Sequence, residues 1–290
     1  MTIPNLEHKR VSSFDGTEIA YQVRGQGPAI VLANGLGGSV GVWRHQYAAF
    51  GERYRVICWD YRGLYGSKRP ADLATLAIDQ QTRDIEAVLA AEGVERALFI
   101  GWSMGVQVNF EYYRRRPEQF AGLVALNGTS GRPFATTVGG PMLERIMPLL
   151  MAVMGRGTSL IQAGGKAVTA WSGLVPMMKR LKLVGQTLDE AVFNDLASDF
   201  TNLDFEAYAE TFRYLGEHDA ADVLPRIRIP TLIVTGSGDI MTPLATAKAM
   251  ARVIRDARLE IIEGGTHYTA VEYPAEVNKA LLAFCEEIGW

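Results

Sequence analysis

The chain has 290 residues, 48% of them hydrophobic and 21% charged, which excludes a disordered protein and allows one large α/β domain with an insertion, or two small domains. Its 29 basic and 32 acidic residues give a net charge of −3 and form no long block of one sign, so we expect no nucleic-acid partner. The two cysteines, Cys58 and Cys285, are too few for a disulfide scaffold, and Cys58 lies in an apolar run, which predicts a buried free thiol. Residues 1–10 contain no apolar signal core and no apolar run approaches membrane-spanning length, so we expect a cytoplasmic protein without a transmembrane segment.

The first half of the chain alternates between short apolar runs and segments of helical periodicity. Residues 11–24 alternate around the turn Asp15-Gly16-Thr17, which predicts an antiparallel hairpin. The apolar runs that follow predict strands buried on both faces, and their alternation with helices implies a parallel sheet covered on both sides. The predicted strands are residues 29–33, 55–59, 97–100 and 123–126, and the predicted helices are residues 43–50, 76–92 and 106–116.

After Asn127 this alternation stops. Residues 131–215 show no further buried strand and contain helix-like segments, three glycine clusters and six of the ten methionines. Strands return at residues 231–235 and 259–262, and a helix over residues 275–288 follows. We therefore expect an α-helical cap, residues 131–215, inserted into one α/β core formed by residues 1–130 and 216–290.

The segment Gly101-Trp102-Ser103-Met104-Gly105 lies between a predicted strand and a predicted helix. It fits the G-x-S-x-G pattern of a nucleophile elbow, in which the glycines leave room for strand and helix to approach and the turn exposes the serine hydroxyl. The amide of Met104 begins a helix whose N-terminus favours negative charge. Because an ordinary turn of small residues fits the same pattern, a base and an acid in the right places must decide between the two interpretations.

His267 is the candidate base and Asp239 the candidate acid. His267 follows the last predicted strand, and Asp239 follows the strand at residues 231–235. Since the carboxyl ends of parallel strands share one edge of a sheet, we expect both side chains to meet Ser103 there. The alternatives are a histidine and an aspartate that cap helices; Thr242-Pro243 already supplies an N-cap and a first helical residue, which makes Asp239 unnecessary for capping.

Two motifs besides the elbow and the His267 loop complete a resemblance to the α/β-hydrolase superfamily over about 200 residues of core. They are Trp59-Asp60-Tyr61-Arg62-Gly63 and the run from Ile229 to Asp239. The resemblance implies an eight-stranded sheet, an inserted cap and an esterase-type serine site in which the amides of Leu36 and Met104 bind the oxyanion. The family usually has His-Gly where this chain has Asn34-Gly35; because the donors are backbone amides, the oxyanion hole can survive this change with altered support. Asp60 and Arg62 are expected to form a structural turn and an ion pair.

These residues predict hydrolysis of a carboxylic ester through an acyl-enzyme, with Ser103 as nucleophile, His267 as base and Asp239 holding the imidazole. No cofactor and no metal is expected. A carbon–carbon bond hydrolase, a perhydrolase or acyltransferase, and a ligand-sensing receptor of the same fold are the alternatives, because fold alone does not separate them. Dehalogenases and epoxide hydrolases of this fold use aspartate at the elbow, so Ser103 argues against both.

The expected partner is a small, apolar ester; the oligomeric state does not follow from the sequence. Residues 141–154 carry only two charges and many methionines, whose flexible side chains adapt to apolar ligands. Trp102, Met147 and Met151 are therefore the candidate substrate-binding residues. The alternative is that these methionines only pack the cap against itself.

Overall fold

The structure, a computed structural model, describes residues 3–137, 142, 174–181 and 183–290. An eight-stranded sheet in the order β1-β2-β4-β3-β5-β6-β7-β8 forms its centre. The pairs β1/β2 and β2/β4 are antiparallel and the remaining pairs are parallel, which confirms the predicted hairpin and the mostly parallel sheet. The strands are β1 (Glu7–Ser12), β2 (Glu18–Arg24), β3 (Ala29–Ala33), β4 (Arg55–Trp59), β5 (Ala97–Trp102), β6 (Phe120–Leu126), β7 (Thr231–Gly236) and β8 (Arg258–Ile262).

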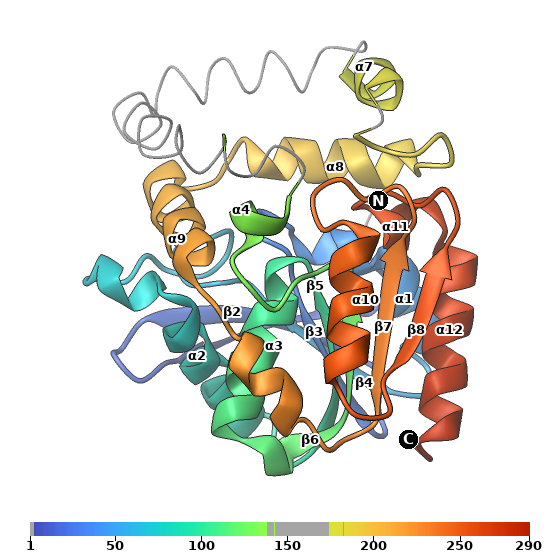
Figure 1. Cartoon of the computed structure of the whole chain (residues 1–290). Helices are drawn as coiled ribbons and strands as arrows, with labels where there is room; N and C mark the ends of the chain where they lie inside the picture. The colour runs from blue at the N-terminus through green and yellow to red at the C-terminus, as the bar shows by residue number, and fades with distance from the viewer. Residues whose placement is uncertain (1–2, 138–141, 143–173, 182) are drawn as a thin grey trace.

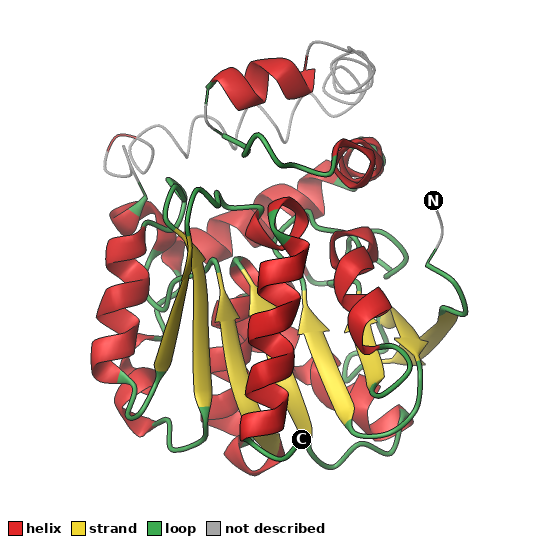
Figure 2. Ribbon diagram, turned by 90° about the vertical axis from the view of Figure 1, so that its right-hand side faces the viewer, coloured by secondary structure: helices red, strands yellow, loops and turns green. Residues whose placement is uncertain are grey.

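The central strands are buried on both faces because helices cover the sheet on both sides (Figure 2). In β3, Val31 and Ala33 belong to one hydrophobic cluster, whereas Ile30 and Leu32 belong to the other, as the two-residue period of a strand requires. Helices α2 (Ile78–Ala91), α3 (Met104–Arg115) and α10 (Leu244–Val253) contribute to the first cluster. Helices α1 (Arg44–Phe50) and α12 (Pro274–Glu287) contribute to the second. Short 3-10 helices occupy Val40–Trp43, Leu73–Leu76, Pro117–Gln119 and Ala221–Arg226.

The helices that begin in the described parts of residues 131–215 lie beyond the carboxyl ends of the parallel strands (Figure 1). They are α4 (Pro133–Thr136), α7 (Leu174–Arg180), α8 (Glu190–Phe200) and α9 (Phe205–Glu217). Asp189 and Asp204 are the N-caps of α8 and α9, and each carboxylate accepts hydrogen bonds from two amides of the first turn. The division into core and cap remains a prediction, and Met147 and Met151 lie outside the described residues.

Two of the minor expectations have clear outcomes. Cys58 and Cys285 are buried free thiols, as predicted for Cys58. The predicted ion pair between Asp60 and Arg62 is wrong: the fully buried Arg62 guanidinium contacts Asp84, at 2.6 Å, and Asp15, at 2.9 Å. The reason is the direction of the Arg62 side chain, which points to α2 and the first hairpin, while the Asp60 carboxylate turns back to accept from the amide of Gly66.

Candidate active site

Ser103 lies on the sharp turn between β5 and α3, with φ 55° and ψ −115°, a strained conformation for a residue with a side chain. The flanking glycines are required by close backbone approach. A Cβ added at Gly101 would lie 2.5 Å from the carbonyl of Gly105, and one added at Gly105 would lie 2.2 Å from the carbonyl oxygen of Ala33. The local sequence therefore forms the strand-turn-helix that a nucleophile elbow needs.

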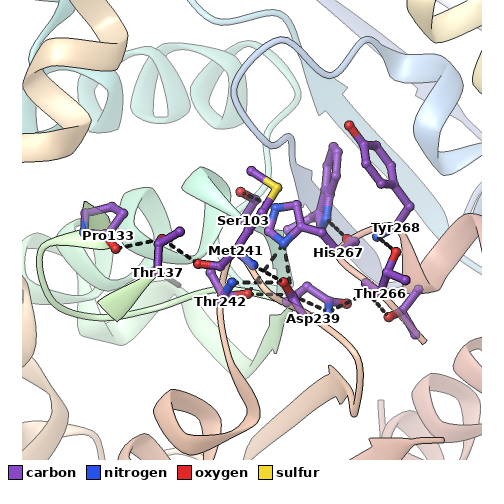
Figure 3. A network of polar contacts seen from close by, with 12 residues as sticks. Ser103, Pro133, Thr137, Asp239, Met241, Thr242, Thr266, His267 and Tyr268 are labelled. Atoms are coloured by element: carbon purple, nitrogen blue, oxygen red, sulfur yellow. Dashed lines mark hydrogen bonds and ion pairs between the residues drawn. The ribbon is translucent and has the colours of Figure 1, made fainter. Parts of the chain in front are cut away.

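The structure brings Ser103, His267 and Asp239 together at the carboxyl edge of the sheet (Figure 3). His267 Nε2 lies 2.9 Å from Ser103 Oγ, and His267 Nδ1 lies 2.9 Å from Asp239 Oδ2. An ionised carboxylate only accepts hydrogen bonds, so the Nδ1–H of His267 donates to Asp239 and Nε2 is left to accept from the serine hydroxyl. His267 and Asp239 are each only 4% exposed.

Asp239 is held ionised by a dense set of donors. Its Oδ1 accepts from the amides of Met241 and Thr242, and its Oδ2 accepts from the Thr242 hydroxyl, at 2.7 Å, besides His267. Burial by itself raises the pKa of Asp239, but the charge of His267 and the hydrogen bonds from His267 and Thr242 outweigh it and lower the pKa to about 2.

The prediction that Thr242-Pro243 caps the following helix is wrong. Helix α10 begins at Leu244, its N-cap is Pro243, and no side chain caps it, because the Thr242 hydroxyl donates to Asp239 instead. Asp239 itself holds the turn that leads into α10, so it has, besides its place next to His267, a structural role close to the capping alternative that the sequence analysis set aside.

Leu36 and Met104, whose amides are the expected oxyanion donors, both line the same cavity as Ser103. Within the described ranges neither amide has a hydrogen-bond acceptor, as an open oxyanion hole requires. Asn34 supports this loop in place of the usual histidine. Its side chain accepts from the indole N–H of Trp43, at 2.6 Å, and donates to the Trp59 carbonyl, at 3.2 Å.

A cavity of about 170 Å³ opens beside Ser103. Leu36, Trp102 and Met104 line it from the core, and the Trp102 indole N–H is held by the carbonyl of His267 at 2.9 Å. The opposite wall comes from α4, α9 and the loop before α10. Its apolar and aromatic members are Pro133, Phe134, Tyr208, Phe212, Leu215 and Met241.

Neither a metal site nor a membrane span is found in the described ranges. No group of three or more His, Cys, Asp or Glu side chains there is arranged to hold a metal ion. In the same ranges, no helix has the length and apolarity that crossing a bilayer requires.

Comparison with known proteins decides the family. The sequence model of the Alpha/beta hydrolase family matches residues 30–280. The chain belongs to this family. A putative carbamate hydrolase RutD from Azorhizobium caulinodans is 29% identical over 271 residues, 93% of this chain and 96% of that protein. The 3-oxoadipate enol-lactonase 2 of Acinetobacter baylyi is 28% identical over 283 residues, 97% of this chain and 98% of that protein.

The fold of this α/β hydrolase is shared with solved structures. A thermophilic esterase from Thermogutta terrifontis, with malate bound, superposes with a TM-score of 0.78 at 20% identity, covering 97% of this chain and 99% of that one. At this identity the likeness shows the fold, and the family match identifies the chain as a hydrolase.

Three side chains at the site of this hydrolase escaped the sequence analysis. Asn127, at a φ of 44°, donates to Asp239 Oδ2 at 2.8 Å and to the Thr266 carbonyl at 3.0 Å, and so joins the two loops that carry Asp239 and His267. The position of Asn127 directly after β6, at the same edge of the sheet as Ser103, was the sequence signal that could have marked it as a site residue. Tyr208 and Phe212 are spaced four residues apart on α9, a helical spacing that could have marked one aromatic face.

Proposed function

We propose that this hydrolase cleaves a carboxylic ester, open-chain or cyclic, through an acyl-enzyme on Ser103. The observation that carries the proposal is the continuous hydrogen-bonded chain from Asp239 through His267 to Ser103, which ends at a cavity with two unpaired backbone amides. The relatives named enol-lactonase and esterase support an ester-like substrate.

In the first half of the reaction Ser103 Oγ attacks the ester carbonyl while His267 Nε2 takes its proton. Asp239 keeps the imidazole in the tautomer that can accept this proton, and it stabilises the imidazolium that forms. The protonated His267 then donates to the leaving alcohol. In the second half a water molecule, deprotonated by His267, attacks the acyl group and releases the acid.

The amides of Leu36 and Met104 stabilise the negative oxygen of each tetrahedral intermediate. One such donor contributes about 3 kcal/mol in comparable sites. Met104 is the first residue of α3, so its amide also has the positive end of the helix dipole behind it.

The cavity supports a small acyl or lactone group. A volume of about 170 Å³ is close to that of a buried cavity that holds one benzene ring. The aromatic wall from α4 and α9 favours the apolar part of such a group, since each buried methylene contributes about 0.8 kcal/mol. The proposed contributions of Met147 and Met151 to a longer pocket stay predictions.

Pre-steady-state kinetics with p-nitrophenyl esters, from acetate to hexanoate, tests the proposal. We expect a burst of p-nitrophenol followed by many turnovers, and a mass increase equal to the acyl group on the peptide that carries Ser103. Ser103→Ala should abolish both, because the alanine fits the elbow and removes only the nucleophile. Ser130→Ala is the matched control: Ser130 is also buried at this edge of the sheet but does not border the cavity, so its burst should persist.

A clean preparation of Ser103→Ala that keeps the wild-type turnover would overturn the assignment of the nucleophile. A single turnover without recovery would instead indicate a ligand sensor that retains the site. Turnover of a dienoic carbon–carbon substrate in preference to every ester would indicate the carbon–carbon bond hydrolase.

A further inference from the structure

Two tyrosines that line the cavity have hydroxyls without a hydrogen-bond partner among the described residues. Each of the other polar side chains that line the cavity makes at least one hydrogen bond with the protein: Ser103, Gln107, Thr129, Thr137, Thr242 and His267. In the part of the chain that the structure describes, no residue donates to or accepts from the hydroxyls of Tyr208 and Tyr268.

Both rings are held in place by aromatic neighbours. Tyr208 stacks on Phe212 with ring centroids 6.2 Å apart and planes 11° apart, and it meets the edge of Phe200 at 5.1 Å. Tyr268 packs edge-on against Phe193 at 5.4 Å and lies 5.6 Å from the Trp102 ring. The positions of the two hydroxyls are therefore set before any ligand arrives.

The two tyrosines line the cavity beside Ser103 from different parts of the fold. Tyr268 directly follows His267, and in Figure 3 its ring extends away from Asp239. Tyr208 packs against the loop that carries the Leu36 amide, since a Cβ added at Gly37 would lie 3.1 Å from the Tyr208 ring. In the cavity wall, one tyrosine thus adjoins His267 in the chain and the other packs on the oxyanion loop.

Both tyrosine side chains are half-buried and their hydroxyls are not sealed from solvent, so a ligand that enters the cavity can replace the water around them and accept their hydrogen bonds. Burial raises the pKa of Tyr208 to about 12, with Tyr268 adding to the rise, and burial also raises the pKa of Tyr268. Both groups therefore stay protonated and can donate. Among the described residues that line the cavity there is no lysine or arginine, so none of these residues offers a cation to a carboxylate.

We propose that Tyr208 and Tyr268 bind a second, uncharged carbonyl oxygen of the substrate, so that the preferred ester carries a keto, ester or amide group in its acyl part. This inference deepens the proposed ester hydrolysis and rests on it. It replaces a purely apolar substrate by one that has a polar group a few bonds from the scissile carbonyl.

Matched ester pairs test the inference: p-nitrophenyl pentanoate against 4-oxopentanoate, and p-nitrophenyl hexanoate against 5-oxohexanoate, each pair differing by one ketone oxygen. For at least one pair we expect wild-type kcat/KM to favour the keto ester by about tenfold, as two net hydrogen bonds allow. In Tyr208→Phe and Tyr268→Phe the keto-to-alkyl ratio should fall by about threefold each, and in the double variant it should approach one. The hemisuccinate ester, with a carboxylate in this position, should be the poorest substrate.

Tyr47→Phe is the matched control, because the Tyr47 hydroxyl likewise has no hydrogen-bond partner but does not border the cavity. Its keto-to-alkyl ratio should equal that of the wild type. A wild-type ratio near one for both pairs, a ratio that survives in the double variant, or a preference for the hemisuccinate would each overturn the inference.

A binding measurement separates this inference from the proposed reaction. Calorimetry on Ser103→Ala should show tighter binding of methyl 4-oxopentanoate or methyl 5-oxohexanoate than of the matching alkyl ester, and the difference should vanish when both tyrosines are phenylalanine. If the wild type cleaves no ester but this difference in binding is present, the proposed ester hydrolysis is wrong, and the proposed binding of a carbonyl group by the two tyrosines is supported. If esters are cleaved and the difference is absent, the tyrosine assignment fails alone.

Discussion

Asp239 and Asp60 are two aspartates of equal burial, 4% and 5% exposed, that follow the carboxyl ends of β7 and β4. Their electrostatic surroundings are opposite. The pKa of Asp239 is about 2, because His267 and several donors outweigh its burial. Burial raises the pKa of Asp60 to about 6, because the Gly66 amide and the Gln22 side chain offset little of it, and Asp199 raises it further.

The difference shows that the partners of a buried carboxylate, and not its burial, decide what it can do. Asp239 remains charged over the whole range in which a histidine works as a base, which is what orienting an imidazolium requires. Asp60 is protonated over part of that range, and its carboxylate accepts from the Gly66 amide of its own turn and from the Gln22 side chain on β2. We therefore expect the two residues to respond in opposite ways to the same substitution.

Asp239→Asn should have the largest effect. The asparagine cannot hold His267 in the accepting tautomer, so kcat should fall on the order of ten-thousandfold if precedent from other serine triads applies. Steady-state kinetics on a p-nitrophenyl ester, with circular dichroism to verify folding, measures this. Asp60→Asn is the matched control and should keep kcat within a few-fold of the wild type; a greater loss in Asp60→Asn than in Asp239→Asn, with both folded, would reverse the assignment of the acid.

Asp60→Asn should instead change how stability depends on pH. The pKa of Asp60 is about 6 in the folded protein against an ordinary 3.8, so the unfolded chain releases its proton first and wild-type stability falls as pH rises from about 4 to 6. Over this interval the free energy of unfolding should fall by about 3 kcal/mol. Urea unfolding at several pH values should show this slope in the wild type and not in Asp60→Asn; parallel curves would contradict the assigned cause.

Asp239 should show the opposite slope at acid pH. Its folded pKa of about 2 lies below the ordinary 3.8, so its contribution to stability is complete above pH 4 and is lost as the pH falls toward 2. The contribution to the free energy of unfolding corresponds to about 2 kcal/mol. The difference in unfolding free energy between wild type and Asp239→Asn should therefore shrink over this interval. A difference that stays constant from pH 5 to pH 2 would mean that the carboxylate is not held by His267 and Thr242.

Tyr65→Phe should have the smallest effect, and it probes the place where the Asp60 turn meets the oxyanion loop. The Tyr65 hydroxyl donates to the Gly37 carbonyl at 2.5 Å, which fixes the loop that carries the Leu36 amide. Loss of one such bond costs about 1 kcal/mol, so kcat should fall about fivefold with little change in KM. Tyr54→Phe removes a similar bond, to the Trp290 carbonyl far from the loop, and should alter stability alone. Equal kcat values for Tyr65→Phe and Tyr54→Phe would show that the Tyr65 hydrogen bond does not position the oxyanion loop.

The sequence by itself determined the sheet and the three triad candidates. Buried strands have a signature that is local, a short apolar run between turns, and β3, β4 and β7 lie within one residue of their predicted bounds. The elbow is also local, because the clash that excludes a side chain at Gly101 comes from Gly105, four residues away. Asp239 and His267 could be paired with Ser103 before any coordinates because parallel strands end at one common edge.

Only the tertiary structure decided which side chains support and surround that site. Asn127 donates to Asp239, which lies 112 positions away in the chain. Arg62 pairs with Asp84 and Asp15 and not with Asp60. The Thr242 hydroxyl donates to Asp239 and does not cap α10. These contacts depend on how loops from distant segments are placed in the fold, and no local sequence pattern predicts them. The cavity wall is the clearest case: Tyr208 and Tyr268 look like ordinary aromatic residues in the sequence. Only the placement of α9, which carries Tyr208, and of the loop before α11 (Thr269–Glu272), which carries Tyr268, brings both to the cavity beside Ser103.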